Sequence, residues 1–354
     1  FLGEGQIHHQ DYQRTGEVTL TINNPDQVVA GLKKETVVED FTLRTMSFGM
    51  ITSPANVSSI NLVGINPNTE KHLSQIDEAL QKGSYFDGDN PRDIVIGNEL
   101  AEILEIELGD RVVITVSEAE TGDLSQEMFR ISGIYHFNIQ EMDKGMAFIR
   151  LHKAQEMLAI GANVHEIALK FKNSQLGRQG THSFWQKYSQ HGNEAQGWTE
   201  LMPQLHAALE LTDFSTLIIG IILFGVVALG IINTLFMAIH ERIFEFGVLR
   251  AVGTRPYKVA QMILFEAGSL AIVSIILGNI LGFIVTYITS QVGIDYTGIE
   301  FAGVTFRQLL YPQLKPVQFA WYPLWVFIIT VLVGVYPAIY AAKITPVHAL
   351  RKTL

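Results

Sequence analysis

The 354-residue sequence predicts an α+β domain followed by membrane-spanning α-helices. Before residue 211, short runs with the alternation of half-buried strands are interspersed with amphipathic helical runs. After it, three stretches contain no Asp, Glu, Lys or Arg. Each stretch is longer than the roughly 20 residues that cross a bilayer as a helix. We therefore expect a water-soluble N-terminal half and a membrane-embedded C-terminal half.

Charge and cysteine content limit the classes of partner and chemistry. From Leu211 onward there are nine Lys and Arg and six Asp and Glu, which leaves 25 − 9 = 16 basic and 35 − 6 = 29 acidic residues before it. A half that carries about −13 lacks the clustered Lys and Arg that bind phosphates, so we expect no nucleic-acid partner. The absence of cysteine excludes disulfides, Cys-ligated zinc and a thiol nucleophile.

In chain order, the N-terminal half is predicted to contain five clear strands and two helices. The strands are at residues 18–22, 93–97, 111–116, 129–135 and 166–171. The helices are at residues 96–106 and 151–160. Gly109 and Asp110 lie between a predicted helix and the next strand, which favours a turn.

Two groups of residues in this half resemble parts of metal sites. His8 and His9 are adjacent, but neighbouring residues of a strand point to opposite faces and do not easily share one ion. Asp87, Asp89 and Asn90 suggest calcium ligands, yet a Glu at the twelfth loop position is missing. We therefore expect no metal site, and interpret the second group as a turn before a strand.

Three membrane helices follow, at residues 214–239, 257–292 and 319–343. In hydrocarbon every backbone amide must be paired locally, so these apolar runs are predicted to be helices rather than strands. A connector at residues 199–213 leads into the first helix, and a loop at residues 293–318 separates the second from the third.

The charges between these helices predict their orientation. The basic residues after the first helix are Arg242, Arg250, Arg255 and Lys258. This segment and the basic tail at residues 344–354 are therefore predicted to be cytoplasmic by the positive-inside rule. The loop at residues 293–318 has no such excess, so we expect it and the large N-terminal domain on the periplasmic side of a bacterial inner membrane.

Three residues within the membrane helices stand out. Gly278 and Gly282 form a GxxxG pattern, which lets helix backbones approach closely, so they are candidates for helix packing. Glu266 is an ionisable group inside an apolar helix, where it is costly unless paired or hydrated. It is either a coupling or gating contact or a carboxylate held near the cytoplasmic interface by Arg or Lys neighbours. The spans hold no companion acids or histidines, which argues against a proton relay.

Residues 240–256 are predicted to form a short amphipathic helix at the membrane face. The apolar residues near helical spacing are Ile243, Phe244, Gly247, Val248 and Val252. Gly253 then favours a helix end, and Pro256 suits the first turn of the next helix.

The same segment carries a family pattern. The motif E-R-x-x-E-x-G-x-L-R-A-x-G is filled by Glu241, Arg242, Glu245, Gly247, Leu249, Arg250, Ala251 and Gly253. It resembles the coupling helix of the FtsX/MacB-like permeases, also called mechanotransmission or type VII ABC systems. Residues 336–351, YPAIYAAKITPVHALR, resemble that family's C-terminal signature, and Glu266 lies where these permeases often have a Glu.

The resemblance implies four membrane helices, with an extracytoplasmic domain between the first and the second. Only three are visible in the sequence, so the first is expected before Phe1 and absent here, with residues 1–17 as a membrane-proximal segment. The domain would consist of a larger, porter-like subdomain at residues 18–60 and 151–198. A small subdomain would be inserted at residues 61–150.

Residues 3–12, GEGQIHHQDY, and the long outer loop resemble the lipoprotein-release, LolC/LolE-like branch more than the macrolide exporters. No G-x-x-x-x-G-K-[ST], G-x-S-x-G or H-E-x-x-H motif occurs, so the chain is expected to be no enzyme. ATP and magnesium would be bound by a partner, an ABC ATPase dimer, and this chain would hold no cofactor.

The function that the resemblance implies is mechanical. Closure of the ATPase dimer would push the coupling helices, tilt the membrane helices and reshape the outer domains. Charged contacts to the ATPase would come from Arg242, Glu245 and Arg250, and apolar anchors would be Phe244, Phe246 and Leu249. The alternative for each residue is to hold the helix at the lipid headgroups.

Two functions fit these expectations. The first is a permease that extracts or exports a lipoprotein or other amphiphilic substrate, working with a second permease, identical or paralogous, and with membrane lipids. The alternative is a signal transmitter that activates a periplasmic cell-wall hydrolase without moving cargo. An intramembrane enzyme is not expected, because the spans lack paired catalytic groups.

Overall fold

The computed structural model describes residues 2–86, 88, 90–137, 139–178, 180, 182–296, 300–301, 304–305 and 309–345, with 300–301 and 304–305 described by backbone alone. The chain divides into two compact units. The first contains residues 1–208 and 298–307, and the second, helical unit contains residues 209–297 and 308–354. Asp87, Asp89 and the tail from residue 346, which includes residues 346–351 of the expected C-terminal signature, lie outside the described residues.

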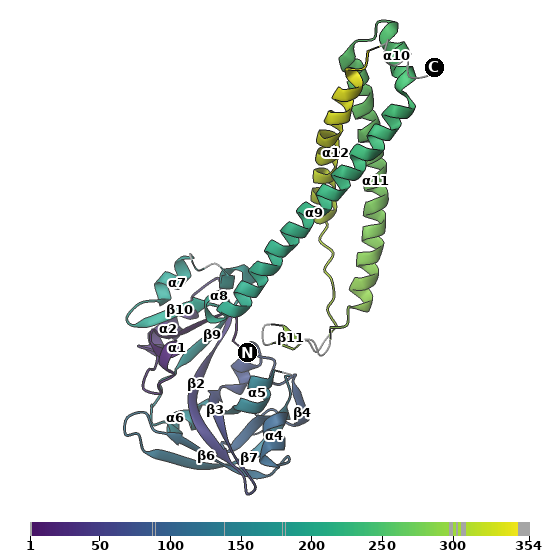
Figure 1. Cartoon of the computed structure of the whole chain (residues 1–354). Coiled ribbons are helices and arrows are strands. Elements are labelled where there is room, and N and C mark those ends of the chain that lie inside the picture. The colour runs from purple at the N-terminus through teal and green to yellow at the C-terminus, as the bar shows by residue number, and fades with distance from the viewer. Residues whose placement is uncertain are drawn as a thin grey trace. The chain divides into compact units, whose positions relative to one another are not determined.

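The first unit is built on a ten-stranded sheet (Figure 1). The strands are β1 (Gly5–His9), β2 (Val38–Thr52), β3 (Val57–Ile65), β4 (Leu80–Gly83), β5 (Asp93–Gly97), β6 (Arg111–Ser117), β7 (Leu124–Tyr135), β8 (Met146–Arg150), β9 (Glu166–Phe171) and β10 (Asn193–Gly197). Its helices are α1 (Tyr12–Thr15), α2 (Pro25–Leu32), α3 (Pro67–Glu70), α4 (Asn98–Leu104), α5 (Gln140–Gly145), α6 (Leu151–Met157), α7 (Ser183–Tyr188) and α8 (Trp198–Leu201), with a 3-10 turn at Ser174–Arg178.

Six strands form a closed ring of hydrogen-bonded neighbours, in the order β2, β3, β8, β5, β7 and β6, with β6 returning to β2. Successive side chains of a strand point to opposite faces, so alternate residues fill the interior. Leu62 of β3 and Ile94 of β5 lie in this interior with residues of α4 and α6. Val63, the next residue of β3, belongs instead to a second apolar cluster.

The remaining strands form a four-stranded antiparallel sheet that shares β2 with the ring. Its order is β10, β1, β9 and the first part of β2. Ile7 of β1 and Phe171 of β9 pack against the aromatic side chains of Phe184 and Trp185 on α7. The length of β2 therefore lets one strand serve two cores.

The expected boundary between residues 60 and 61 falls inside a strand. β2 and β3 pair continuously, from Thr52 with Val57 to Arg44 with Ile65, and both strands belong to the ring. The chain thus enters the ring within β2, before the predicted start of the inserted subdomain.

Residues 18–22, predicted as a strand, form no strand in the structure. β9 is already paired on both sides, with β1 and β2, so it offers no edge to a further strand. The segment is tied instead to the residues just before β9. Ile22 N donates to Val164 O at 2.8 Å, and His165 Nε2 contacts Val18 O at 2.8 Å. The apolar alternation indicated burial, since Ile22 is buried, but it did not indicate pairing.

The other predicted elements of this unit are confirmed as β5, β6, β7, β9, α4 and α6. α4 begins at Asn98 rather than at residue 96, because Ile96 and Gly97 complete β5. The turn predicted at Gly109 is also present, with a φ of 90° that favours glycine.

A buried ion cluster lies on β2 where the ring and the four-stranded sheet meet. Arg44 contacts the two carboxylate oxygens of Glu70 at 2.6 and 3.1 Å and Glu166 Oε1 at 2.7 Å. Burial raises the pKa of the Glu166 carboxyl, and the positive charge of Arg44 opposes that shift. Because loss of one member would leave an uncompensated buried charge, the cluster fixes α3 onto β2 and β9.

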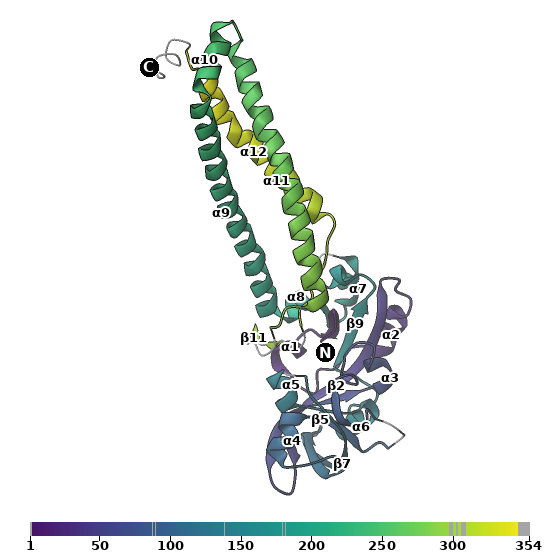
Figure 2. The same ribbon diagram turned by 90° about the vertical axis from the view of Figure 1, so that its right-hand side faces the viewer.

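The helical unit consists, in its described part, of three long helices and a short one (Figures 1 and 2). They are α9 (Pro203–Glu241), α10 (Ile243–Ala251), α11 (Pro256–Val292) and α12 (Gln318–Ala342). The long helices have the length and composition to cross a bilayer, as the three uncharged stretches predicted. α9 also includes most of the expected connector at residues 199–213. Between α11 and α12 in the sequence, β11 (Glu300–Phe301) pairs with β12 (Val304–Thr305), and these residues belong to the first unit.

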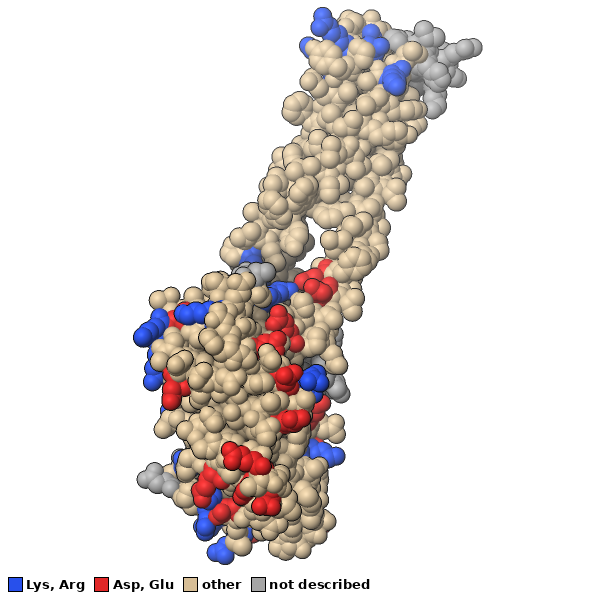
Figure 3. All heavy atoms as spheres, turned by 90° about the vertical axis from the view of Figure 1, so that its left-hand side faces the viewer, with Lys and Arg blue, Asp and Glu red and all other residues tan. Residues whose placement is uncertain are grey.

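Close packing in this unit is confined to the end that carries α10. In the described part of this unit, buried residues lie in the last turns of α9, in α10, in the first half of α11 up to Ala271 and in the second half of α12 from Thr330. Most apolar side chains of the other halves are exposed, as expected for helices surrounded by lipid. Figure 3 shows basic side chains gathered at the α10 end and a long uncharged stretch along the helices.

Candidate functional site

The segment between α9 and α11 is shaped by two interruptions of helical geometry. Arg242 lies between α9 and α10, with φ −104° and ψ 16°, and α10 begins at the next residue. At the other end, Gly253 has a φ of 101°, in the left-handed region that favours glycine. Pro256 occupies the first turn of α11, where its missing N–H costs nothing. The helix end predicted at Gly253 and the helix start predicted at Pro256 are confirmed.

Arg242 joins α10 to α11 through two carboxylates. Its Nε donates to Glu245 Oε2 at 3.0 Å, and its Nη1 contacts both oxygens of Glu266, at 3.0 and 3.2 Å. The hydrogen bond to Glu245 and the negative charge of Glu266 raise the pKa of the Arg242 guanidinium. Glu266 thus has the basic neighbour that an ionisable group in an apolar helix requires.

Phe246 anchors α10 to the long helices. It is only 2% exposed and packs in an apolar cluster with Leu235 of α9 and Val259 of α11. The Arg242 guanidinium lies over its ring, 5.5 Å from the centroid. Gly247 is buried beside it. Phe246 therefore faces the interior of the unit, where burying such a side chain is worth about 1.5–3 kcal/mol.

The opposite side of α10 is apolar and exposed. Phe244, Val248, Leu249 and Val252 have exposed side chains, with Val252 82% exposed, and we name these four residues the outer face of α10. Three of them belong to the apolar set that helical spacing singled out, whereas the residue buried most deeply is Phe246. An exposed apolar surface beside charged residues marks a contact with a protein or a membrane.

Two further residues of the family pattern lie at the ends of this segment. Glu241 is exposed at the last position of α9. Arg250 lies in the last turn of α10, where its Nη1 donates to Thr254 O at 3.2 Å. A cation at this position also interacts favourably with the carboxyl end of the helix dipole.

Within the described chain, Gly278 and Gly282, which were predicted to pack helices, have more space around them than Gly334 has. At Gly334 of α12, a Cβ would lie 3.5 Å from Ala267 Cβ of α11. Gly278 has open space around it, and a Cβ at Gly282 would approach Phe319 at 3.9 Å. The GxxxG pattern therefore faces a cavity here, and its role in packing stays a prediction.

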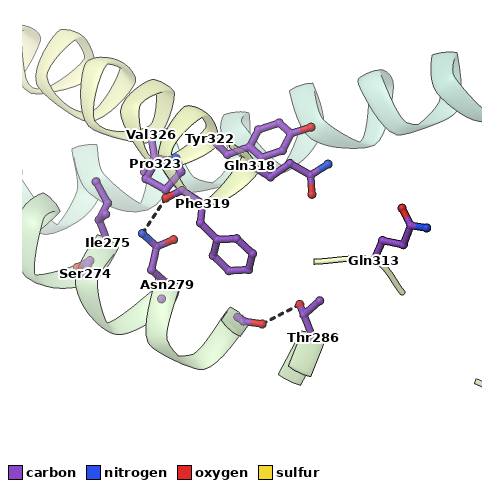
Figure 4. Close-up of a pocket in the computed structure, with 12 residues that line it drawn as sticks. Ser274, Ile275, Asn279, Thr286, Gln313, Gln318, Phe319, Tyr322, Pro323 and Val326 are labelled. Atoms are coloured by element: carbon purple, nitrogen blue, oxygen red, sulfur yellow. Dashed lines mark hydrogen bonds between the residues drawn. The ribbon is translucent and has the colours of Figure 1, made fainter. Parts of the chain in front are cut away.

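Asn279 of α11 is a polar residue that the sequence patterns did not single out. Pro323 in α12 has no N–H, so the carbonyl of Phe319, four residues earlier, lacks its helical donor. Asn279 Nδ2 donates to that carbonyl at 3.2 Å (Figure 4). Neighbouring side chains commonly satisfy backbone groups that proline frees in membrane helices. A lone Asn in one apolar run and a Pro in another were the only signals for this pair.

Among the residues that the structure describes, no group of three or more His, Asp or Glu could hold a metal ion. His8 and His9 are consecutive in β1, as their interpretation assumed. His8 is buried and its Nδ1 contacts the carbonyl of His9 at 2.9 Å.

The chain is similar to known proteins in sequence and in structure. Residues 217–346 match the family described as "FtsX-like permease C-terminal". The chain is 24% identical over 308 residues to the lipoprotein-releasing system transmembrane protein LolC of Xylella fastidiosa, covering 81% of this chain and 72% of that protein. It is 21% identical over 314 residues to LolE of Haemophilus influenzae, covering 85% and 74%.

Among solved structures, the periplasmic region of MacB from Actinobacillus actinomycetemcomitans resembles 57% of this chain and 92% of its own length, with a TM-score of 0.39 and 14% identity. The family resemblance drawn from the segment at residues 241–253 is confirmed by the match over residues 217–346.

Proposed function

Residues 217–346 form an FtsX-like permease C-terminal domain, and from this premise we propose that the chain couples ATP hydrolysis by a separate ATPase to movement of its first unit. The chain is a multi-pass membrane protein and an ABC transporter permease, by its apolar helices and its relatives. The observation that carries the proposal is the outer face of α10, an exposed apolar surface on a short helix that is fixed to three membrane helices.

The outer face suits a protein partner better than lipid headgroups. Charges of both signs surround it, since Glu241 and Glu245 are exposed close to Arg242 and Arg250. A surface with apolar residues at its centre and charges around it has the composition of a protein interface. In this proposal Phe244 and Leu249 contact the ATPase as apolar anchors, with the two carboxylates at the rim.

A push on α10 reaches the membrane helices through two contacts. The first is the ion pair between Arg242 and Glu266, which leads to α11. The second is Phe246, whose cluster includes residues of α9, α11 and α12. Because a packed cluster shifts between discrete arrangements rather than deforming continuously, movement of α10 displaces the long helices together.

Orientation and cargo complete the proposal. The excess of basic residues around α10 supports a cytoplasmic location for this end and an extracytoplasmic location for the first unit. ATP and magnesium are bound by the ATPase dimer, and a second permease chain completes the complex. The substrate that we propose is a lipoprotein or another amphiphile, which is supported by the relatives named as lipoprotein-releasing proteins.

The ATPase contact is tested by replacing Val252 with Asp. Val252 is apolar and 82% exposed, and a carboxylate at this position would have to lose its hydration when the ATPase binds. The amount of ATPase that co-purifies with the permease is therefore expected to fall at least about tenfold, which corresponds to roughly 1.4 kcal/mol of binding free energy. The measurement is the ratio of ATPase to permease after purification from membranes.

The matched control is Leu124→Asp, which places the same charge at a 72% exposed apolar residue of the first unit. This variant is expected to retain the ATPase as the unmodified chain does. Equal ATPase retention by Val252→Asp, with normal permease yield, would contradict the proposed contact.

A further inference from the structure

A cavity of about 470 Å³ lies between α11 and α12, away from their close contact near α10. Its wall on α11 includes Ile275, Gly278 and Asn279, and its wall on α12 includes Pro323 and Val326. Figure 4 shows the Asn279 amide and the Phe319 ring between the two helices, with the Gln313 and Gln318 side chains near the start of α12. The cavity therefore occupies the halves of the helices that bury no residue of their own.

The chemistry of the lining changes along the cavity. Two amides, Gln313 and Gln318, lie where α12 begins, and the described structure gives them no hydrogen-bond partner. Further along, the wall is mostly apolar, with Pro323 and Val326 of α12 and Ile275 of α11, although Tyr322 and Ser274 also line it. Among the described residues that line the cavity there is no Asp, Glu, Lys or Arg. Such a lining accepts a neutral group with hydrogen-bond acceptors at one end and hydrocarbon at the other.

The size of the cavity selects among possible occupants. The α11 residues that line it run from Ser274 to Thr286, a length of about 18 Å at 1.5 Å per residue. A volume of about 470 Å³ over that length gives a mean cross-section of roughly 26 Å². A helix about 10 Å across needs on the order of 80 Å². One alkyl chain in contact at about 4 Å needs on the order of 15–20 Å².

We propose that this cavity holds one acyl chain of a membrane glycerophospholipid, with its ester carbonyl near Gln313 and Gln318. The amide N–H groups donate to the ester oxygen, and the chain runs between Ile275 and Val326 toward Ser274. In hydrocarbon an unfilled cavity of this size would forfeit its dispersion contacts, so a lipid tail is the available filler. Gly278 keeps the path open, because a larger side chain there would occupy it.

This inference goes beyond the proposed coupling. It depends on the membrane placement of α11 and α12 and not on an ATPase or on a lipoprotein. The hydrogen bond from Asn279 to the Phe319 carbonyl stabilises the wall of the cavity. It satisfies a backbone acceptor there, so no water molecule is needed in the cavity for that purpose.

The test is native mass spectrometry of the full chain, with its co-purified ATPase, released from nanodiscs of synthetic phosphatidylethanolamine and phosphatidylglycerol. Gly278→Leu fills the cavity without an initial clash, since a Cβ there meets nothing within 4 Å. We expect it to retain one phospholipid fewer per permease chain than the unmodified protein. Gly225→Leu in α9, where a Cβ also meets nothing within 4 Å, is the matched control and is expected to retain the full number.

Equal phospholipid retention by all three proteins would overturn the inference. A second result would also overturn it, namely that Gly278→Leu loses binding of a synthetic triacylated peptide while its phospholipid retention stays unchanged. The cavity would then bind the lipoprotein cargo rather than a membrane phospholipid. An electron cryo-microscopy map of the unmodified complex gives a check that needs no variant. It is expected to show a rod of density one chain wide beside Gly278, and a helix or an empty cavity there would overturn the inference.

Discussion

At the scale of single residues, His165 shows how burial fixes a protonation state in the first unit. Its Nδ1 accepts the backbone N–H of Met46 at 3.1 Å, and its Nε2 donates to Val18 O at 2.8 Å. The ring is fully buried and stacks on Tyr12 with centroids 5.2 Å apart. Because one ring nitrogen accepts and the other donates, this geometry requires the neutral imidazole.

Burial lowers the pKa of the His165 imidazole below its ordinary value of 6.5, although its bond to Val18 opposes the shift. The unfolded chain therefore binds this proton at a higher pH than the folded protein. The stability that His165 contributes is present above about pH 6.5 and is lost as the pH falls.

We predict that His165→Asn is less stable than the unmodified chain at pH 7.5 and that the difference shrinks toward pH 5.5. One proton accounts for at most about 1.4 kcal/mol per pH unit. The measurement is the unfolding temperature of the first unit in the full, nanodisc-embedded protein, recorded across this range. His152→Asn, at an exposed position, should follow the unmodified chain, and a constant difference for His165→Asn would argue against the neutral imidazole.

At the scale of elements, the contact between α10 and α11 depends on a pair that lies near the membrane surface. Arg242 and Glu266 are each about one-third exposed or slightly more, at 33% and 40%. Solvent screening therefore limits their direct attraction to about 0–1 kcal/mol. The larger effect comes from leaving one charge alone beside an apolar cluster.

We predict that Arg242→Gln lowers the unfolding temperature of the helical unit more than the double variant Arg242→Gln with Glu266→Gln. The double variant removes both charges, so neither is left unpaired. The four corners of the cycle are compared by thermal unfolding in nanodiscs. Glu245→Gln, which removes the other, 61% exposed carboxylate, should have a small effect. Additive losses at Arg242 and Glu266 would show that the two side chains are not coupled.

At the scale of the whole molecule, the charges around α10 bear on topology. The helices themselves expose apolar side chains over most of their length, and the basic residues gather at the α10 end (Figure 3). By the positive-inside rule we propose that this end lies in the cytoplasm. The absence of cysteine makes this placement directly measurable, since one introduced Cys is a unique label site.

We predict that a membrane-impermeant maleimide labels Leu124→Cys in intact spheroplasts, and labels Val252→Cys only after permeabilisation. Both positions are highly exposed, so access to the reagent decides the result. The cysteine-free parent provides the background. Labelling of Val252→Cys in intact spheroplasts would reverse the assigned orientation.

The sequence by itself determined the features that depend on local chemistry. The three long helices follow from uncharged runs, and the end of α10 and the start of α11 follow from Gly253 and Pro256. Strands such as β6 and β9 follow from alternation of apolar residues. The family pattern at residues 241–253 was equally legible. Each of these signals is contained in a few consecutive residues, so no distant contact was needed to interpret it.

Only the tertiary structure decided which side chains meet. In α10, a helix of nine residues, apolar spacing did not show that Phe246 faces inward while Val248 is exposed. Residues 18–22 have the composition of a strand, but β9 has no free edge to accept them. The bond from Asn279 to the carbonyl that Pro323 frees joins two helices whose residues are about 40 positions apart. Such contacts depend on how distant elements pack, and periodicity within one element carries no information about its neighbours.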